Sequence, residues 1–488
     1  MPDVLIVDLN NFARYPTLAI GYLVAPLRQA GFRVKVLSPL AIGAPAPERE
    51  KAETRLEHFK RRINFATHPL MQRLHEPLRR TYSQWQSGPH KPTLQAVTAY
   101  LEQQQPDIIL LSAYLDHYPV VSAIAALARS HAIPVLLGGP AFSQAETVQD
   151  WLALPGVSAI FAGEADPLIA RLVRETIQCK DIARYDGVFV QGRQGQVAAP
   201  LTDLDRLPVP DFDDFDWDAY PHRIIPVMTG RGCSWGVCTF CSDVTSANGR
   251  SYRSRSLQQV LHELQVQADR YGSRDFIFLD LKLNSSLEVW RGLITDFQRI
   301  LPGGRWIATV HVDAKGDNGL DYETLRAAQQ AGLTRISFGL ETASPQLARR
   351  MGKGTDIERN RRFVQDAWRA GLSVRCSMML GYPGETTADL EQTRAFLAEH
   401  DQEFDRVRPA RFKVIPGTRF ERLYHHRPGR FQGMAQVDWD YRYARAAYVY
   451  QPASAPDYRR VKRKILQQVH RINRKPLRDA AVQFDGLM

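Results

Sequence analysis

Short apolar runs alternate with helix-length amphipathic stretches from Val4 to Gly192. The runs are rich in Val, Ile and Leu, which is typical of strands that are buried on both faces of a parallel sheet covered by helices. The pattern therefore predicts a doubly wound, Rossmann-like domain over residues 1–197. The expected strands are Val4–Asp8, Arg33–Leu37, Asp107–Ser112, Pro134–Leu137, Ser158–Ala162 and an edge strand at Gly187–Val190.

A charged segment at about residues 45–92 interrupts this rhythm. Its stretches EREKAETRLEHFKRRINF and RLHEPLRRTYSQW have helical periodicity and few apolar positions, so they predict an inserted helical pair. We expect a solvated helical excursion. A lid over an active site, or a dock for a substrate peptide, is the alternative.

Residues 198–222 are rich in Pro and Asp without any period, which indicates a linker between domains. Six strand–helix units then follow over residues 223–416, and this number predicts a parallel partial (β/α)6 barrel of the TIM type. The expected strands are Ile224–Met228, Asp275–Leu279, Trp306–His311, Arg335–Gly339, Ser373–Leu380 and Arg411–Ile415.

The remaining residues, 417–488, predict a small helical C-terminal region. Within it, Tyr458 to Arg474 has apolar residues at helical spacing among seven basic ones. This spacing favours an amphipathic helix packed on the core. A contact with nucleic acid or with a leader peptide is the alternative.

The composition limits the class of protein. Apolar residues make up 44% of the chain, and no apolar run approaches the roughly 20 residues of a membrane-spanning helix. The N-terminus lacks the features of a signal peptide, so we expect a cytoplasmic protein without a membrane partner. The net charge of +11 is spread along the chain, which makes nucleic acid an unlikely partner. The isolated Cys179 and Cys376 are expected to be buried.

Three of the five cysteines gather in the segment TGRGCSWGVCTFCSD, directly after a predicted strand. Cys233, Cys238 and Cys241 have the spacing C-x4-C-x2-C on a glycine-rich loop. Three thiolates suit three irons of a [4Fe–4S] cluster, and the lack of a nearby fourth cysteine leaves one iron open for a substrate. A structural zinc site is the alternative, but zinc ribbons take their ligands as two separated pairs.

With this loop after the first barrel strand, the chain resembles the radical S-adenosylmethionine (SAM) superfamily. The spacing departs from the usual C-x3-C-x2-C of that superfamily by one residue. The phrases FIFLDLKLN, SFGLETAS, MMLGYPGET and KVIPGT follow in the order of the superfamily's strand ends. The resemblance implies that Asp280 binds the methionyl amine of SAM, with Lys282 and Asn284 near it on the strand end. Capping of the following helix is the alternative role for Glu385. The implied SAM contacts are Phe240, Asp280, Glu341, Gly381 and Glu385.

The N-terminal domain resembles that of superfamily members that bind cobalamin. Asn10 stands where the better-known cobalamin domains have a histidine ligand to cobalt, so the resemblance implies cobalamin bound without that histidine. A Rossmann-like domain that has lost the cofactor is the alternative, and we interpret His117 as an ordinary loop histidine. The implied cobalamin contacts are Asn10, Ser112, Tyr114, Gly138, Gly139, Gly163 and Glu164.

The resemblance implies a cobalamin-dependent radical methyltransferase. A 5′-deoxyadenosyl radical would activate an unactivated carbon, with flavodoxin or ferredoxin as electron donor. The phrase WGVCTFC and the end of the chain look most like maturases of ribosomal peptides and natural-product tailoring enzymes, which implies a peptide or small-molecule substrate. Cyclisation, rearrangement or oxidation without methyl transfer is one alternative. A tRNA-modifying or RNA-binding protein is an alternative of another class, and no catalytic residue is assigned.

Overall fold

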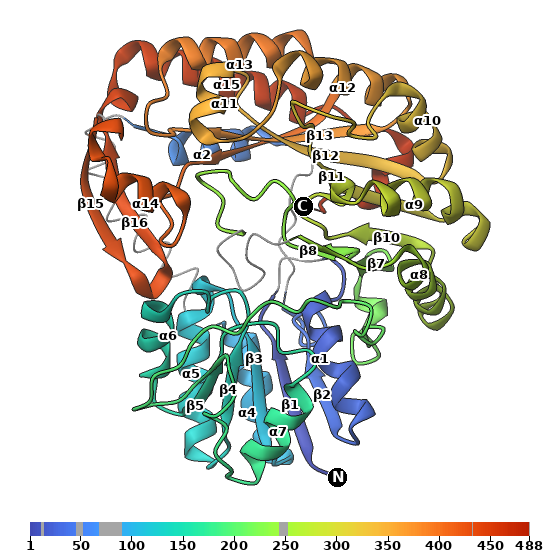
Figure 1. Cartoon of the computed structure of the whole chain (residues 1–488), viewed down its shortest axis with the longest axis vertical. Coiled ribbons are helices and arrows are strands. Elements are labelled where there is room, and N and C mark those ends of the chain that lie inside the picture. The colour runs from blue at the N-terminus through green and yellow to red at the C-terminus, as the bar shows by residue number, and fades with distance from the viewer. Residues whose placement is uncertain (11–13, 45–51, 68–89, 244–251, 432, 488) are drawn as a thin grey trace.

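The computed structural model describes residues 1–10, 14–44, 52–67, 90–243, 252–431 and 433–487. Two six-stranded sheets stand one above the other in Figure 1, with the N-terminal sheet at the bottom. The two sheets and their covering helices confirm the predicted α/β fold class. The exact boundaries predicted between the segments stay predictions.

The N-terminal sheet has the strand order β2-β1-β3-β4-β5-β6, parallel except for the antiparallel edge strand β6. Alternate residues of one strand enter opposite cores: Ile6 packs in one apolar cluster and Val7 in another, which is the arrangement expected for a sheet buried on both faces. The strands are β1 (Asp3–Asp8), β2 (Arg33–Leu37), β3 (Ile108–Ser112), β4 (Val135–Gly138), β5 (Val157–Phe161) and β6 (Val188–Phe189). The helices are α1 (Leu18–Gln29), α4 (Lys91–Gln103), η1 (Leu115–His117), α5 (Tyr118–Ser130), α6 (Ala145–Leu152) and α7 (Ile169–Ile177).

The second sheet runs β14-β13-β12-β11-β10-β7, and every pair in it is parallel. Its strands are β7 (Ile224–Val227), β10 (Asp275–Phe278), β11 (Arg305–Val310), β12 (Leu333–Glu341), β13 (Ser373–Leu380) and β14 (Phe404–Arg411). The helices are η2 (Trp217–Ala219), α8 (Leu257–Tyr271), η4 (Leu283–Ser285), α9 (Leu287–Ile300), α10 (Tyr322–Gln330), α11 (Pro345–Met351), α12 (Ile357–Arg369) and α13 (Thr387–Glu399). A small antiparallel pair, β8 (Gly230–Arg231) and β9 (Arg253–Ser254), follows the first barrel strand.

The sixth barrel strand lies earlier than predicted. The structure places β14 at Phe404–Arg411, whereas the apolar run had suggested Arg411–Ile415. The strand was hidden because it buries charged residues: Arg406 is 2% exposed and donates from Nη1 to the carbonyls of Asp405 and Lys475. Val414 instead forms an isolated bridge with Ala446.

The C-terminal region is only partly helical. The predicted basic helix is α15 (Pro456–Asn473), and Val461, Ile465, Leu466 and Val469 are buried in it, which confirms packing on the core. A β-hairpin precedes this helix. It was not predicted, because its strand sequences MAQVDWD and RAAYVY are short and mix charged with apolar residues. The elements are α14 (Arg419–His426), η5 (Pro428–Phe431), β15 (Met434–Asp440), η6 (Tyr441–Tyr443), β16 (Arg445–Tyr450), η7 (Gln451–Ser454), α15 and η8 (Asp479–Phe484).

Contacts of the hairpin, the linker and the charged insertion help to hold the halves together. The hairpin reaches the N-terminal domain, where Trp151 Nε1 of α6 donates to the carbonyl of Arg442. The linker is tied down because Asp211 accepts from Arg28 of α1 and from Arg270 of α8. The charged insertion forms α2 (Arg55–Asn64), which lies against α15 beside the barrel (Figure 1); its second predicted helix falls outside the described residues.

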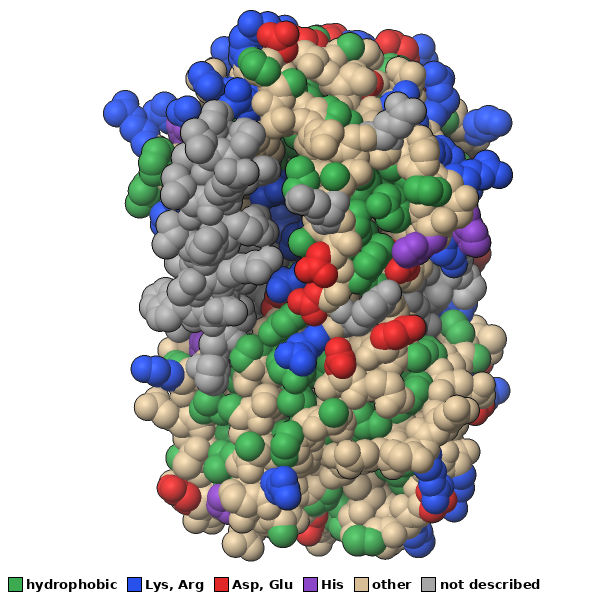
Figure 2. Space-filling view, turned by 90° about the vertical axis from the view of Figure 1, so that its left-hand side faces the viewer, with side chains coloured by type: hydrophobic (Ala, Val, Ile, Leu, Met, Phe, Trp, Pro, Cys, Tyr) green, Lys and Arg blue, Asp and Glu red, His purple; other side chains and the backbone are tan. Residues whose placement is uncertain are grey.

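The two cysteines outside the loop differ in their burial. Cys376 is buried as predicted, whereas Cys179, which lies just after the end of α7, is exposed, so its predicted burial is wrong. Within the described ranges, no helix is both long and apolar enough to span a membrane. On the face in Figure 2, Lys and Arg side chains stand singly or in small groups rather than in one stripe.

Candidate active site

The cysteine loop begins where β7 ends and is docked onto the turn after α11. Trp235 Nε1 donates to the carbonyl of Gly352 over 2.7 Å, and the amide of Thr239 donates to the carbonyl of Met351 over 2.8 Å. Gly354 has a φ of +66°, and a Cβ there would lie 2.1 Å from the Trp235 ring. Only a glycine at this position lets the indole lie against the turn.

None of the three cysteines forms a disulfide, and all three are partly exposed. One zinc ion would hold tetrahedral thiolates about 3.8 Å apart, given Zn–S bonds near 2.3 Å. Among the described residues, the three cysteines do not form a group with its sulfur atoms within 4.8 Å of one another. An iron–sulfur cluster binds each cysteine to a different iron and so needs a wider triangle. The donor set therefore fits the cluster better than a single zinc ion.

Burial raises the pKa of the Cys238 thiol to about 11, although the neighbouring Lys353 opposes this shift. Because thiolates are the form that binds metal, occupation of the site by iron must overcome this preference for the thiol. Metal binding at the loop is therefore coupled to proton release from Cys238.

Glu341, a predicted SAM contact, ends β12 next to the cysteine loop. It has a φ of +58°, where β12 shifts register against β13, and such strain in a non-glycine residue is typical of functional sites. Its carboxylate lies 3.8 Å from Lys353 Nζ and accepts from Ser377 Oγ over 3.2 Å. Burial raises the pKa of Glu341 against the opposing effects of Lys353 and Ser377.

Asp280 braces the start of the cysteine loop. Its carboxylate accepts from the amide of Thr229 over 3.0 Å and from Thr229 Oγ1 over 2.7 Å, and burial raises its pKa to about 6. Lys282 pairs with Asp313 over 2.7 Å, while Asn284 bonds to backbone groups of His311 and Asn318. These bonds fix the segment after β10 to its neighbours.

Two further predicted SAM contacts lie in one turn after β13. Gly381 has a φ of +83° with open space around its Cα, as a close ligand approach requires. Glu385 accepts from the amide of Gly381 over 2.7 Å and from the Tyr458 hydroxyl of α15. It does not cap α13, whose N-cap is Thr386. Phe240 packs against the apolar cluster around Tyr382 and Phe420.

The carboxyl edge of the N-terminal sheet contains the predicted cobalamin residues. Ligands bind doubly wound sheets where the strand order reverses, which is here between β1 and β3. Asp8 pairs in register with Ser112 at this point, and Asn10 follows two residues after Asp8. Asn10 is 6% exposed, yet its Oδ1 has no hydrogen-bond partner among the residues that the structure describes. This unpaired buried acceptor fits a site completed by a bound group.

The other predicted cobalamin residues of this edge are two tight glycines, one glycine with more room and one exposed tyrosine. Gly139 has a φ of +107°, and a Cβ there would lie 2.8 Å from the Ala113 amide, whereas Gly138 has more room. Tyr114 is 41% exposed, and its amide donates to Nδ1 of His117. Gly163 has a φ of +153°, and a Cβ there would meet Ala198.

Glu164 connects the two halves of the molecule. It accepts from Arg253 Nη1 over 2.7 Å, and Asp166 accepts two bonds of 2.9 Å from Arg231. These acids follow β5, and the arginines lie in β8 and β9, which flank the cysteine loop. The carboxyl edges of the two sheets therefore face each other, and Glu164 acts in this junction.

Residues 227–397 match the radical SAM superfamily. The barrel is a radical SAM domain. A [4Fe–4S] cluster and SAM are the cofactors that such a domain implies. The chain is 26% identical over 346 residues to an uncharacterized methyltransferase of Pyrococcus horikoshii, an alignment that covers 67% of this chain and 71% of the relative.

Two other similar proteins differ in coverage. The chain is 28% identical over 256 residues to the anaerobic magnesium-protoporphyrin IX monomethyl ester cyclase of Rubrivivax gelatinosus, covering 49% of this chain and 44% of the cyclase. The radical SAM methyltransferase TsrM of Kitasatospora setae superposes with a TM-score of 0.69 at 16% identity, covering 96% of this chain and 91% of TsrM. At that identity, the likeness to TsrM shows the shared fold.

Sequence reasoning missed three residues that contact Glu341 or hold the cysteine loop in place. Lys353 lies beside Glu341, and Trp235 and Arg231 fix the loop from either side. The only sequence signal for Lys353 is its place between two glycines, Gly352 and Gly354. Arg231 has no signal of its own, because its partner Asp166 is 65 residues away.

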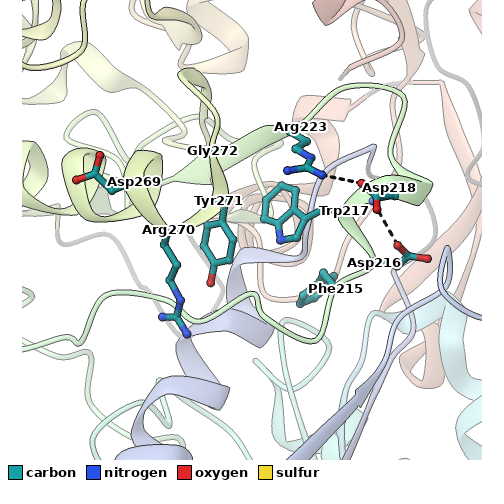
Figure 3. Close-up of a pocket in the computed structure, with 9 residues that line it drawn as sticks. All are labelled: Phe215, Asp216, Trp217, Asp218, Arg223, Asp269, Arg270, Tyr271 and Gly272. Carbon is teal, nitrogen blue, oxygen red and sulfur yellow. Dashed lines mark hydrogen bonds and ion pairs between the residues drawn. The ribbon is translucent and has the colours of Figure 1, made fainter.

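A surface hollow between the linker and the end of α8 lies apart from these residues. Figure 3 shows Trp217 beside Tyr271, with ring centroids 4.8 Å apart, and Arg223 paired with Asp218. The Tyr271 hydroxyl accepts from the amide of Phe212. These contacts fix the linker on the radical SAM domain, and the hollow contains none of the predicted site residues.

Proposed function

We propose that the chain is a cobalamin-dependent radical SAM enzyme that methylates an unactivated carbon. The observation that carries this proposal is the junction of the two sheet edges. The loop with the three cysteines is held by ion pairs to the edge that contains Asn10 and Ser112. Groups bound at the two edges would therefore share one reaction space.

Cys233, Cys238 and Cys241 would hold three irons of the cluster. When bound, the cluster supplies one electron for cleavage of SAM, and cobalamin supplies a methyl group. Glu341 would accept hydrogen bonds from ribose hydroxyls or from the methionyl amine, with Lys353 and Ser377 fixing its orientation. Gly381 and the backbone at Phe240 would line the adenosine, while Asp280 would hold the loop in register.

The cobalamin assignment rests on the edge between β1 and β3. The unpaired Oδ1 of Asn10 would accept a hydrogen bond from the cofactor, and Gly138 leaves space for it. Ser112, Tyr114, Gly139 and Gly163 would surround the same group. We leave Glu164 out of these contacts because its described bonds are made across the junction. The TsrM structure with a similar fold contains both cobalamin and a [4Fe–4S] cluster, which supports this arrangement.

The relatives support two reaction types. The methyltransferase of P. horikoshii and TsrM favour methyl transfer, and tryptophan is bound in one TsrM structure. A small-molecule or peptide substrate is therefore our proposal, with a flavodoxin or ferredoxin as reductant. The cyclase of R. gelatinosus favours a radical ring closure as the second candidate. A site of this kind needs reduced thiols, which keeps the cytoplasmic expectation in place.

The test is anaerobic incubation of cluster-loaded protein with SAM, hydroxocobalamin and a reductant. We expect 5′-deoxyadenosine and S-adenosylhomocysteine, because radical formation releases the first and methyl transfer the second. The variant C233A/C238A/C241A should release no 5′-deoxyadenosine. Release of 5′-deoxyadenosine alone in the presence of substrate would favour the cyclase-like candidate. No product from a fully loaded sample would refute the proposal.

A further inference from the structure

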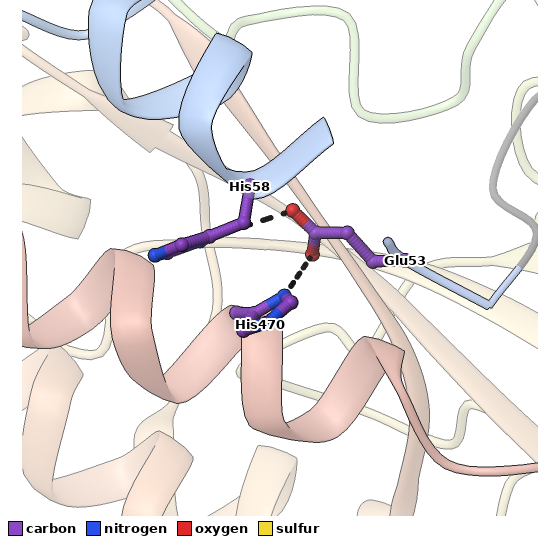
Figure 4. A group of neighbouring side chains, drawn as sticks. All are labelled: Glu53, His58 and His470. Carbon is purple, nitrogen blue, oxygen red and sulfur yellow. Dashed lines mark ion pairs between the residues drawn. The ribbon is translucent and has the colours of Figure 1, made fainter. Parts of the chain in front are cut away.

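A second cluster of metal-binding side chains lies far from the cysteine loop, where the insertion meets the C-terminal helix. Glu53 precedes α2, His58 lies in its first turns, and His470 lies near the end of α15 (Figure 4). One ligand atom from each lies within 4.8 Å of the other two. Among the described residues this is the only such group of three.

Local structure places these side chains firmly. The backbone amide of Glu53 donates to the carbonyl of Asn473 over 2.9 Å, which joins the start of α2 to the end of α15. Thr54 forms a capping box with Glu57, so α2 begins directly after Glu53. The imidazoles of His58 and His470 stack with ring centroids 4.2 Å apart. The three groups therefore meet where the start of α2 is joined to the end of α15.

The cluster leaves one buried atom of each residue unsatisfied. Within the described part of the chain, Glu53 Oε1, His58 Nδ1 and His470 Nδ1 have no hydrogen-bond partner, although the Glu53 side chain is only 3% exposed. The distances of 3.9 Å from His58 Nδ1 to Glu53 Oε1 and 3.5 Å from His470 Nδ1 to Glu53 Oε2 are too long for hydrogen bonds. Arg61 bonds only to Oε2, over 2.6 Å. Such orphaned atoms normally have a partner, such as a metal ion.

We propose that Glu53, His58 and His470 bind one zinc ion, or a similar divalent transition metal, that clasps the insertion to the C-terminal helix. Two imidazoles and a carboxylate are ligands that zinc prefers, and they lie about 3.3 Å apart in tetrahedral sites with bonds of 2.0–2.1 Å. The atoms therefore need to close by about 1.5 Å at most. A water would take the fourth position.

Two features support binding of a cation. Burial is the main cause that lowers the pKa of His58, so the ring is neutral at pH 7 as metal binding requires, whereas the positive charges of Arg61 and Arg62 oppose a bound cation. The two imidazoles are 14% and 16% exposed, which leaves an approach for the ion. Coordination in the plane of both rings requires the stack to open from its interplanar angle of 23°.

The experiment uses the full chain with C233A/C238A/C241A, so that the cysteine loop cannot bind the metal and the proposed function plays no part. Titration with Co²⁺ should give the absorption of a tetrahedral ion, and Zn²⁺ should displace it at one equivalent. Zn²⁺ should also raise the melting temperature, because it binds only the folded state.

Variants H58Q, H470Q and E53Q should each weaken Co²⁺ binding by about tenfold or more. The matched control H262Q replaces an exposed histidine of α8 and should bind as the parent does. If the parent binds no Co²⁺, or if H58Q and H470Q bind it as tightly as H262Q, the proposal is wrong and the cluster is an ion-pair network. Because the first result needs no substitution at the site, misfolding of one variant cannot decide the outcome.

Discussion

The two sheet edges that face each other differ in how the polar side chains of their predicted cofactor contacts are bonded. On the barrel edge, Asp280 and Trp235 have bonded partners, and the cysteine loop is docked before any ligand arrives. On the N-terminal edge, Asp8 accepts from Thr17 Oγ1 and the Asn10 amide, but Asn10 Oδ1 is left without a partner in the part of the chain that the structure describes. We infer that the barrel edge is built to position thiolates, whereas the N-terminal edge is completed by what it binds.

The largest expected effect comes from breaking the junction between the edges. Arg231 is 10% exposed, and R231A would leave Asp166 charged and buried without its partner. Removing one member of a buried pair costs about 3–5 kcal/mol. We expect denaturant unfolding to show this loss and the iron content to fall. R193A, which breaks the exposed pair with Asp181, should cost no more than about 1 kcal/mol. Equal losses for both variants would contradict the account.

The pH dependence of stability tests what the two edges have in common. Burial raises the pKa of both Asp8 and Asp280 to about 6 from the usual 3.8. Between about pH 4 and 6 the folded state then holds protons that the unfolded state has lost, so stability falls as the pH rises and levels off above 6. D280N should remove the contribution of Asp280 to this fall in the free energy of unfolding, on the order of 1–3 kcal/mol over the whole range. Unchanged unfolding curves across this range would contradict the burial effect.

Asn10 sharpens the difference between the edges. N10L removes an unpaired buried acceptor, whose desolvation costs about 1–3 kcal/mol. The free energy of unfolding of the ligand-free N10L protein should therefore be equal to or higher than that of the parent. The same change should weaken retention of hydroxocobalamin during gel filtration, while iron content stays at the wild-type value. Full corrin retention by N10L would show that the unpaired oxygen plays no part in binding.

The smallest effect is expected from one bond of the docked loop. W235F removes the bond from Nε1 to the Gly352 carbonyl, which is worth about 1 kcal/mol. We expect faster loss of iron under a chelator with little change in overall stability. W368F alters a tryptophan that is 40% exposed on α12 and serves as the control. Identical rates of iron loss would mean that the indole does not hold the loop.

Local patterns predicted the elements of the fold better than they predicted contacts. Apolar runs located five barrel strands, but β14 was misplaced because its charged residues find partners far away, such as Lys475 for Arg406. The cysteines were found because their spacing is local. Arg231 was missed because its ion pair with the distant Asp166 leaves no trace near either residue, and Lys353 has only its two flanking glycines as a local signal. The roles of the predicted cofactor contacts stay predictions.

The most direct test of the central claim is metal analysis of anaerobically purified protein. The account predicts about four irons and four sulfides per chain, with the brown colour of a [4Fe–4S] cluster, all lost in C233A/C238A/C241A. Colourless, iron-free protein with zinc on Cys233, Cys238 and Cys241 would contradict it.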